Sequence, residues 1–157
     1  MRNRDLSYLL GRQPNAYAII KGREGNEITG NTSFYQTPYG VVVVTSVSGL
    51  PQNNIECENK IFAIHIHSGN ECAGNEQDPF LNTGAHYNPN NCPHPHHAGD
   101  MPPLFSANGF AFSVYLTNNF TVEEIVGKTI VIHENLDDFT TQPSGNAGEK
   151  IACGAII

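Results

Sequence analysis

Apolar and polar residues alternate over short distances along most of this chain, a pattern that is typical of β-strands. The strand-like segments are rich in Val, Ile, Thr and aromatic residues, and Gly, Pro or Asn residues separate them. They cover residues 16–22, 28–35, 40–47, 60–67, 109–116, 129–133 and 151–157. A helical turn is indicated only near Val122. Many short strands with turn signals between them predict an all-β sandwich or barrel.

The segment from residue 68 to about residue 104 interrupts this pattern. It is rich in Gly, Asn and Pro and is predicted to be a loop, although irregular segments of this length are uncommon in compact domains. It contains four of the seven histidines. Long loops of this kind often carry functional residues, and metal coordination by these histidines would explain the loop.

Length and charge limit the classes of protein to consider. The 157 residues are enough for one domain with its own core, and we expect a polar arm over 1–15 followed by a single domain over 16–157. A net charge of −7 argues against nucleic acids and anionic membranes as partners. No apolar run is long enough for membrane insertion, and no signal peptide is recognisable. The sequence leaves two locations open: the cell envelope or beyond if a signal lies outside this chain, and otherwise the cytoplasm.

All seven histidines lie between residues 65 and 133. Neutral imidazole binds zinc and copper, and this number of imidazoles exceeds what one four-coordinate zinc needs, which predicts two metal ions. Each group also has a plainer explanation when it is taken alone. His65 and His67 could face solvent on one face of a strand, and the histidines near residue 95 could form a flexible exposed cluster. His133 could be a hydrogen-bonded core residue.

Five short motifs, taken in order, resemble those of the copper/zinc superoxide dismutase family. They are His65-Ile66-His67, His86-Tyr87-Asn88-Pro89, His97-Ala98-Gly99-Asp100, Ile132-His133-Glu134 and the closing block Gly145–Gly154. One motif alone is a weak signal, but five in this order are specific, and the resemblance extends from about Ala16 to the end of the chain. It implies an eight-stranded Greek-key β-barrel or sandwich, immunoglobulin-like in architecture, with two long functional loops.

The resemblance also implies which residues hold the two metals. Copper would be bound by His65, His67, His86 and His133, and zinc by His86, His94, His97 and Asp100, with the His86 ring shared. His94 is preferred to His96 because it lies eight residues after His86, which is the family's spacing. The loop that follows is shorter than the family's, which leaves this choice open. Asp137 matches a carboxylate that hydrogen-bonds one histidine of each metal.

The implied activity is the conversion of superoxide to dioxygen and hydrogen peroxide at the copper ion, with the His86 ring supplying a proton. Lys150 stands where the family has an arginine that guides superoxide. Lysine keeps the charge but lacks the planar fork of arginine, which predicts an active enzyme of reduced efficiency. The alternative is a non-catalytic copper- or zinc-binding protein on the same scaffold, although all four copper-side histidines are present. The family contains monomers and dimers, so a homodimer remains open.

The four cysteines have no CxxC spacing and by themselves allow three complete pairings. The resemblance pairs Cys72 with Cys153. A second bridge between Cys57 and Cys92 is favoured because it would brace the shortened loop, whereas two inert buried thiols are the alternative for Cys72 and Cys153. Two bridges together would favour an oxidising compartment.

Overall fold

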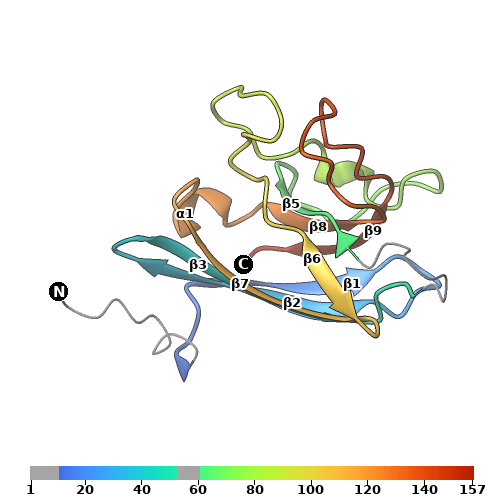
Figure 1. Cartoon of the computed structure of the whole chain (residues 1–157), viewed down its shortest axis with the longest axis horizontal. Coiled ribbons are helices and arrows are strands. Elements are labelled where there is room, and N and C mark those ends of the chain that lie inside the picture. Colours follow the sequence, from blue (N-terminus) through green and yellow to red (C-terminus); the bar gives the residue numbers. More distant parts are fainter. Residues whose placement is uncertain (1–10, 53–60) are drawn as a thin grey trace.

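A computed structural model describes residues 11–52 and 61–157, which form one antiparallel sheet that closes into a barrel (Figure 1). Its strands are β1 Ala16–Gly22, β2 Thr29–Thr37, β3 Gly40–Ser48, β4 Ile61–Phe62, β5 Ile64–His67, β6 Leu104–Ala107, β7 Phe110–Thr117, β8 Thr129–His133 and β9 Lys150–Ala155. Their order in space is β4-β6-β7-β3-β2-β1-β9-β8-β5. Helical structure in residues 12–52 and 61–157 is limited to α1, Val122–Ile125, and a 3-10 turn, η2, at Leu81–Thr83. The prediction of an all-β fold is confirmed.

The first three strands are neighbours in the sheet because short connections, residues 23–28 and residues 38–39, join them as hairpins. In β3 the side chains of Val41, Val43 and Val47 point inward and are almost fully buried. They belong to the main core together with Phe34 of β2. Alternation with a period of two determines which face of each strand is buried, and this fixes the register of the hairpins. The predicted and observed bounds of these strands differ by at most two residues.

One short stretch of chain closes the barrel. The predicted strand over 60–67 is divided at Ala63 into β4 and β5, and these two pieces pair with different strands, β6 and β8. The N–H of Ala63 donates to the carbonyl of Asn135 at 2.8 Å, and its own carbonyl accepts from the N–H of His133 at 2.9 Å. The described residues therefore hold nine strands where eight were predicted, because one expected strand contributes to both edges of the sheet.

Strand β6 lies between the predicted loop over 68–104 and the predicted strand over 109–116, and the sequence pattern did not predict it. The loop ends where β6 begins, and β6 pairs with β7 through Ser106 and Ala107 and with β4 through Leu104 and Phe105. Four residues directly after two prolines are too few to display a clear alternation, which is why the sequence pattern missed the strand. The helical turn expected near Val122 is confirmed as α1, which a Thr121–Glu124 capping box starts.

The barrel has two unlike sides. In Figure 1, β1, β2, β3 and β7 form the lower layer, and long loops rise above β5, β8 and β9. These loops follow β5 and β8 and contain the motifs with most of the candidate ligands. No helix within the described ranges has the length and apolar character needed to cross a bilayer.

Candidate metal centre

Three backbone segments meet along one edge of β5. His67 pairs with His86, and His65 pairs with Asp100, across isolated β-bridges. A side chain at Gly99 would collide with a backbone carbonyl oxygen of β5, so glycine allows this close approach. The segment that was predicted to be irregular therefore runs beside a strand at two of the points where it carries candidate ligands.

Four buried histidines form the first candidate group: His65, His67, His86 and His133. Their ligating nitrogens all lie within 4.8 Å of one another, and Nε2 of His67 is 3.2 Å from Nε2 of His133. Burial, followed by repulsion from neighbouring histidines, lowers the pKa of His67 well below its ordinary value and that of His133 to about 3. Both rings therefore stay neutral near pH 7, which is the protonation state that binds a metal.

Three histidines and one carboxylate form the second group: His86, His94, His97 and Asp100. One carboxylate oxygen of Asp100 lies 2.8 Å from Nδ1 of His86, and the other lies 3.1 Å from Nδ1 of His94 and 3.3 Å from Nδ1 of His97. Burial opposes ionisation of Asp100, but hydrogen bonds from His86 and from the His97 N–H outweigh it and lower the pKa. Three imidazoles and one carboxylate are a ligand set that zinc accepts.

The buried nitrogens without hydrogen-bond partners fit two cations. These atoms are Nδ1 of His65, Nε2 of His86 and Nδ1 of His94, whose 3.1 Å contact with Asp100 is not a hydrogen bond. A buried polar atom without a partner is costly, and each of these three belongs to a residue of one or both groups. His86 contributes to both, because its Nδ1 lies beside Asp100 and its Nε2 remains for the first group. The donor set therefore fits copper and zinc, which share affinity for imidazole.

Asp137 connects the two groups from outside. Its carboxylate oxygens accept hydrogen bonds from Nε2 of His65 and Nε2 of His94, both at 2.8 Å. Burial opposes ionisation of Asp137, but the hydrogen bond from His65, together with those from the Phe139 N–H and His94, lowers the pKa to about 2. The carboxylate therefore directs the unpartnered Nδ1 of both rings toward the centre, as carboxylates beside metal-bound histidines do.

Backbone carbonyls orient two further rings. Nδ1 of His67 donates to the carbonyl of Gly84 at 2.8 Å, and Nδ1 of His133 donates to the carbonyl of Gly148 at 3.2 Å. Each bond leaves Nε2 as the ligating atom. Sequence patterns identified the four histidines but could not identify these carbonyls, because every residue carries one.

His94 and His96 lie in different surroundings although only one residue separates them. His94 is 3% exposed and lies between Asp100 and Asp137, whereas His96 is exposed and belongs to neither group. Their positions favour His94 as the candidate ligand.

Lys150, at the start of β9, lines a pocket of about 420 Å³ together with His67, His86 and His133. Its ammonium group donates to Oδ2 of Asp78 at 2.8 Å and to the carbonyl of Phe80 at 3.1 Å. Burial opposes ionisation of Asp78, but the Lys150 contact and the Phe80 N–H lower its pKa. An acidic side chain thus offsets part of the charge beside the pocket. Sequence analysis missed Asp78, since nothing in its local pattern relates it to a lysine 72 residues away.

A disulfide joins Cys72 to Cys153, with 5.6 Å between their Cα atoms, and confirms the predicted pairing. It ties the loop that carries Asp78 to the strand that begins at Lys150. Cys92 forms no disulfide with another described residue. Cys57 lies outside the described residues, so the second predicted bridge stays a prediction.

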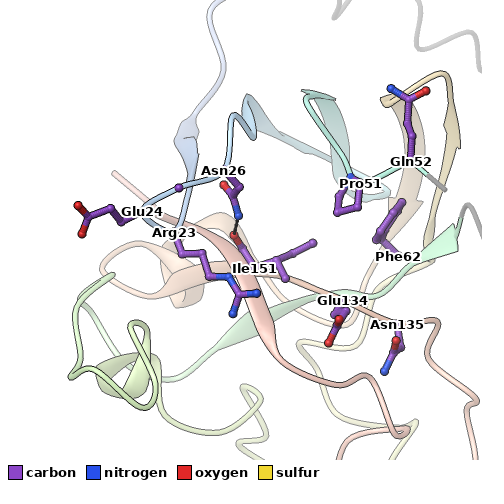
Figure 2. A pocket seen from close by; sticks show the side chains of 10 residues that line it. Arg23, Glu24, Asn26, Pro51, Gln52, Phe62, Glu134, Asn135 and Ile151 are labelled. Atoms are coloured by element: carbon purple, nitrogen blue, oxygen red, sulfur yellow. Dashed lines mark hydrogen bonds between the residues drawn. The ribbon is translucent and has the colours of Figure 1, made fainter.

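A second cavity, of about 640 Å³, contains no histidine among its described lining residues (Figure 2). Arg23 and Asn26 lie on one side of it, and Phe62, Glu134 and Asn135 lie on the other. Asn26 donates to the carbonyl of Ile151 at 3.2 Å, as the dashed line shows. Although this cavity is larger than the one beside Lys150, it lacks a convergent set of ligating groups.

The amino-acid sequence matches a family model across most of its length. Residues 28–156 match the model for copper/zinc superoxide dismutase. The chain belongs to this family. A relative named superoxide dismutase [Cu-Zn] 2, from Aquifex aeolicus, is 32% identical over 156 residues, which cover 90% of this chain and 85% of that protein.

Solved structures of copper/zinc superoxide dismutases and related proteins are also similar. A superoxide dismutase-like protein from Bacillus subtilis has a TM-score of 0.73 and 26% identity, with 90% of this chain and 97% of that chain covered. The copper/zinc superoxide dismutase from Brucella abortus has a TM-score of 0.74 at 22% identity, over 89% of this chain and 98% of that chain, and so supports the fold. The predicted superoxide dismutase barrel is confirmed.

Proposed function

We propose that this protein is a superoxide dismutase, which converts two superoxide ions and two protons to dioxygen and hydrogen peroxide. One observation carries the proposal: the His86 ring offers Nδ1 to one ligand group and Nε2 to the other. We assign copper to His65, His67, His86 and His133, and zinc to His86, His94, His97 and Asp100. The family match supports this assignment of metals.

The side chains around the centre have separate roles in the proposed reaction. When bound, copper supplies one-electron exchange with superoxide, while zinc supplies positive charge without redox chemistry. His67 and His133 present neutral Nε2 atoms on a rigid sheet. His86 lines the pocket, and its Nε2 is placed to hold a proton and release it to the product. Because Nδ1 of His86 is held on the zinc side, the ring keeps its position while Nε2 exchanges a proton.

Lys150 is the proposed guide for superoxide. A chain of net charge −7 repels an anion, so a local cation beside the pocket raises the encounter rate. Asp78 offsets part of that cation, and lysine lacks the fork of donors that arginine offers. Both features support the expectation of an active enzyme that is less efficient than one with an unpaired arginine.

The proposed partners are limited. Superoxide is the substrate, and the negative net charge disfavours nucleic acid. For the oligomeric state we propose a homodimer, with a monomer as the alternative, since the family resemblance implies both.

Metal analysis combined with a superoxide assay tests the proposed function. Metal-free protein would be loaded with zinc alone or with copper and zinc, and the bound metals and the rate of superoxide consumption would be measured. We expect about one ion of each metal per chain and turnover only in the copper-containing sample. Bound zinc without copper-dependent turnover would instead support the non-catalytic alternative.

A further inference from the structure

His94 lies in a segment whose backbone makes few hydrogen bonds to the rest of the barrel. Pro93 and Pro95 flank it and have no N–H to donate. Among the described residues, and apart from His94, the backbone groups of residues 88–96 form hydrogen bonds only within this segment. The N–H and the carbonyl of His94 are therefore the points at which the backbone of this segment is held from outside, and the residue is buried.

Gln142 supplies the partner for both of these backbone groups. Its Oε1 accepts from the N–H of His94 at 3.0 Å, and its Nε2 donates to the carbonyl of the same residue at 2.7 Å. A side-chain amide carries an acceptor oxygen and two N–H donors, so one glutamine can pair with a backbone residue as a neighbouring strand would. The two residues are 48 positions apart, which is why no local sequence pattern indicates the contact.

The same loop also holds the imidazole ring of His94. Asp137, shortly before Gln142 in the chain, accepts from Nε2 of this ring at 2.8 Å. The ring's Nδ1 has no hydrogen-bond partner and lies beside Asp100. Since the loop after β8 fixes both the backbone and the far side of the ring, it determines the direction in which Nδ1 of His94 points.

The loop after β8 has a shape that its own hydrogen bonds fix. The carboxylate of Asp138 accepts from the N–H groups of Thr140 and Thr141, at 2.9 and 2.8 Å. The N–H of Gly145 donates to the carbonyl of Thr141 at 2.7 Å, and its carbonyl accepts from the N–H of Asp138 at 2.9 Å. Gln142 therefore extends from a closed turn, and such a preorganised side chain loses less conformational entropy when it forms its hydrogen bonds.

The loop after β8 and the segment with His94 are in direct contact. A Cβ atom at Gly145 would collide with Oδ1 of Asp137 and with Nε2 of His94. The φ of Gly145 is +68°, which residues with a side chain rarely adopt. Glycine at this position therefore allows the close approach that brings Gln142 within hydrogen-bonding distance of His94.

We propose that Gln142 is a positioning residue of the zinc site, which fixes the backbone of His94 so that Nδ1 faces the other three zinc-side ligands. This inference rests on the proposed assignment of His94 to zinc. A ligand that is held in place before the ion binds strengthens metal binding, as partners of metal-bound histidines do. The side-chain amide of Gln142 bonds only His94 and Thr140 among the described residues, so copper binding should not depend on it.

Release of metals from the protein loaded with copper and zinc tests this proposal. Gln142→Met keeps the length of the side chain and removes its amide, and the residue is exposed, so the core stays intact. In excess chelator, the initial rate of zinc release should rise about 10-fold, while that of copper stays unchanged. Gln77→Met is the matched control, because Gln77 is exposed and its side chain forms no hydrogen bond with a described residue.

Cobalt(II) in place of zinc gives a second measurement. Its visible absorption depends on the arrangement of its ligands, so the bands should shift in Gln142→Met and match the wild type in Gln77→Met. Zinc release at the wild-type rate, or an unchanged cobalt spectrum, would overturn the proposal. So would an equal increase in zinc and copper release, which would indicate a general loss of stability. Superoxide turnover is assayed separately, and its absence in the wild type would count against the proposed function alone.

Discussion

The hairpin side of the barrel and the metal side are organised by different interactions. On the hairpin side, β1, β2 and β3 pair with their neighbours in sequence and bury apolar side chains such as Phe34. On the metal side, contacts join residues that are far apart in sequence: His65 and Asp137 are separated by 72 residues, and His67 and His133 by 66. These contacts are polar and buried.

The difference shows that fold and function depend on separate sets of residues. Hydrophobic burial stabilises the hairpin side without help from a ligand. The metal side instead keeps buried ring nitrogens without partners, a cost that bound cations would remove. Substitutions on the two sides should therefore affect different measurements.

The largest expected effect is that of His86→Ala. This substitution removes one nitrogen from each ligand group, and we expect turnover to fall at least ~1,000-fold, with loss of both metals from their sites. His96→Ala is the matched control, since His96 is exposed in the same loop and should retain metal content and rate. Metal analysis and superoxide assays on both variants check the prediction. Full turnover by His86→Ala would show that the two groups do not depend on a shared ring.

Phe34→Ala tests the hairpin side, where a substitution should lower stability and leave metal binding unchanged. Phe34 is fully buried, and its loss should lower the free energy of unfolding by about 3–5 kcal/mol because a cavity remains. The folded fraction should still bind one copper and one zinc ion. Urea unfolding and metal analysis at low temperature measure the two properties. Loss of metal from the folded variant would contradict the separation between the two sides.

Acid should weaken the metal side of the metal-free protein. The pKa of His133 is lowered to about 3 and that of His67 well below its ordinary value, so the folded state leaves both rings neutral where the unfolded chain binds protons. Stability from this source is present above pH ~6.5 and is lost as the pH falls toward the lowered values. Lowering the pH from 7.5 to 5 should cost about 2 kcal/mol through His133, and His67 should add to this loss.

Urea unfolding of the metal-free protein at both pH values measures this loss. Phe34→Ala should show the same pH dependence as the wild type, whereas His133→Asn should show a smaller one. An equal pH dependence in all three proteins would place its origin outside the metal centre.

The smallest expected effect is that of Asp78→Asn. Removing the carboxylate frees the charge of Lys150, and superoxide turnover at low salt should rise by about two- to fivefold. The gain should fade as salt screens the charge. Glu71→Gln removes the same charge elsewhere in the loop and serves as the control. The steady-state rate of superoxide consumption would be measured for each variant at two ionic strengths. An unchanged or lower rate in Asp78→Asn would mean that Asp78 does not weaken the attraction between Lys150 and superoxide.

The sequence was most informative where structure follows from local pattern. Alternation located β1, β2 and β3, and the order of five motifs identified two ligand groups that the fold brings together. Strand β6 was missed because four residues after two prolines show too little periodicity. The pairing of Lys150 with Asp78 was missed because it arises from the loop that the disulfide holds against β9. Such contacts depend on tertiary packing, and the sequence around each of the two residues carries no signal of them.

The most direct test of the central claim is a crystal structure of the protein loaded with zinc and with copper in the Cu(II) state, in which Nε2 of His86 carries no proton. We expect Nε2 of His86 on one ion and Nδ1 of His86 on the other, each at about 2.0 Å. The remaining ligands should divide as His65, His67 and His133 on one side and His94, His97 and Asp100 on the other. A His86 ring bound to one ion alone, or to neither, would contradict the account.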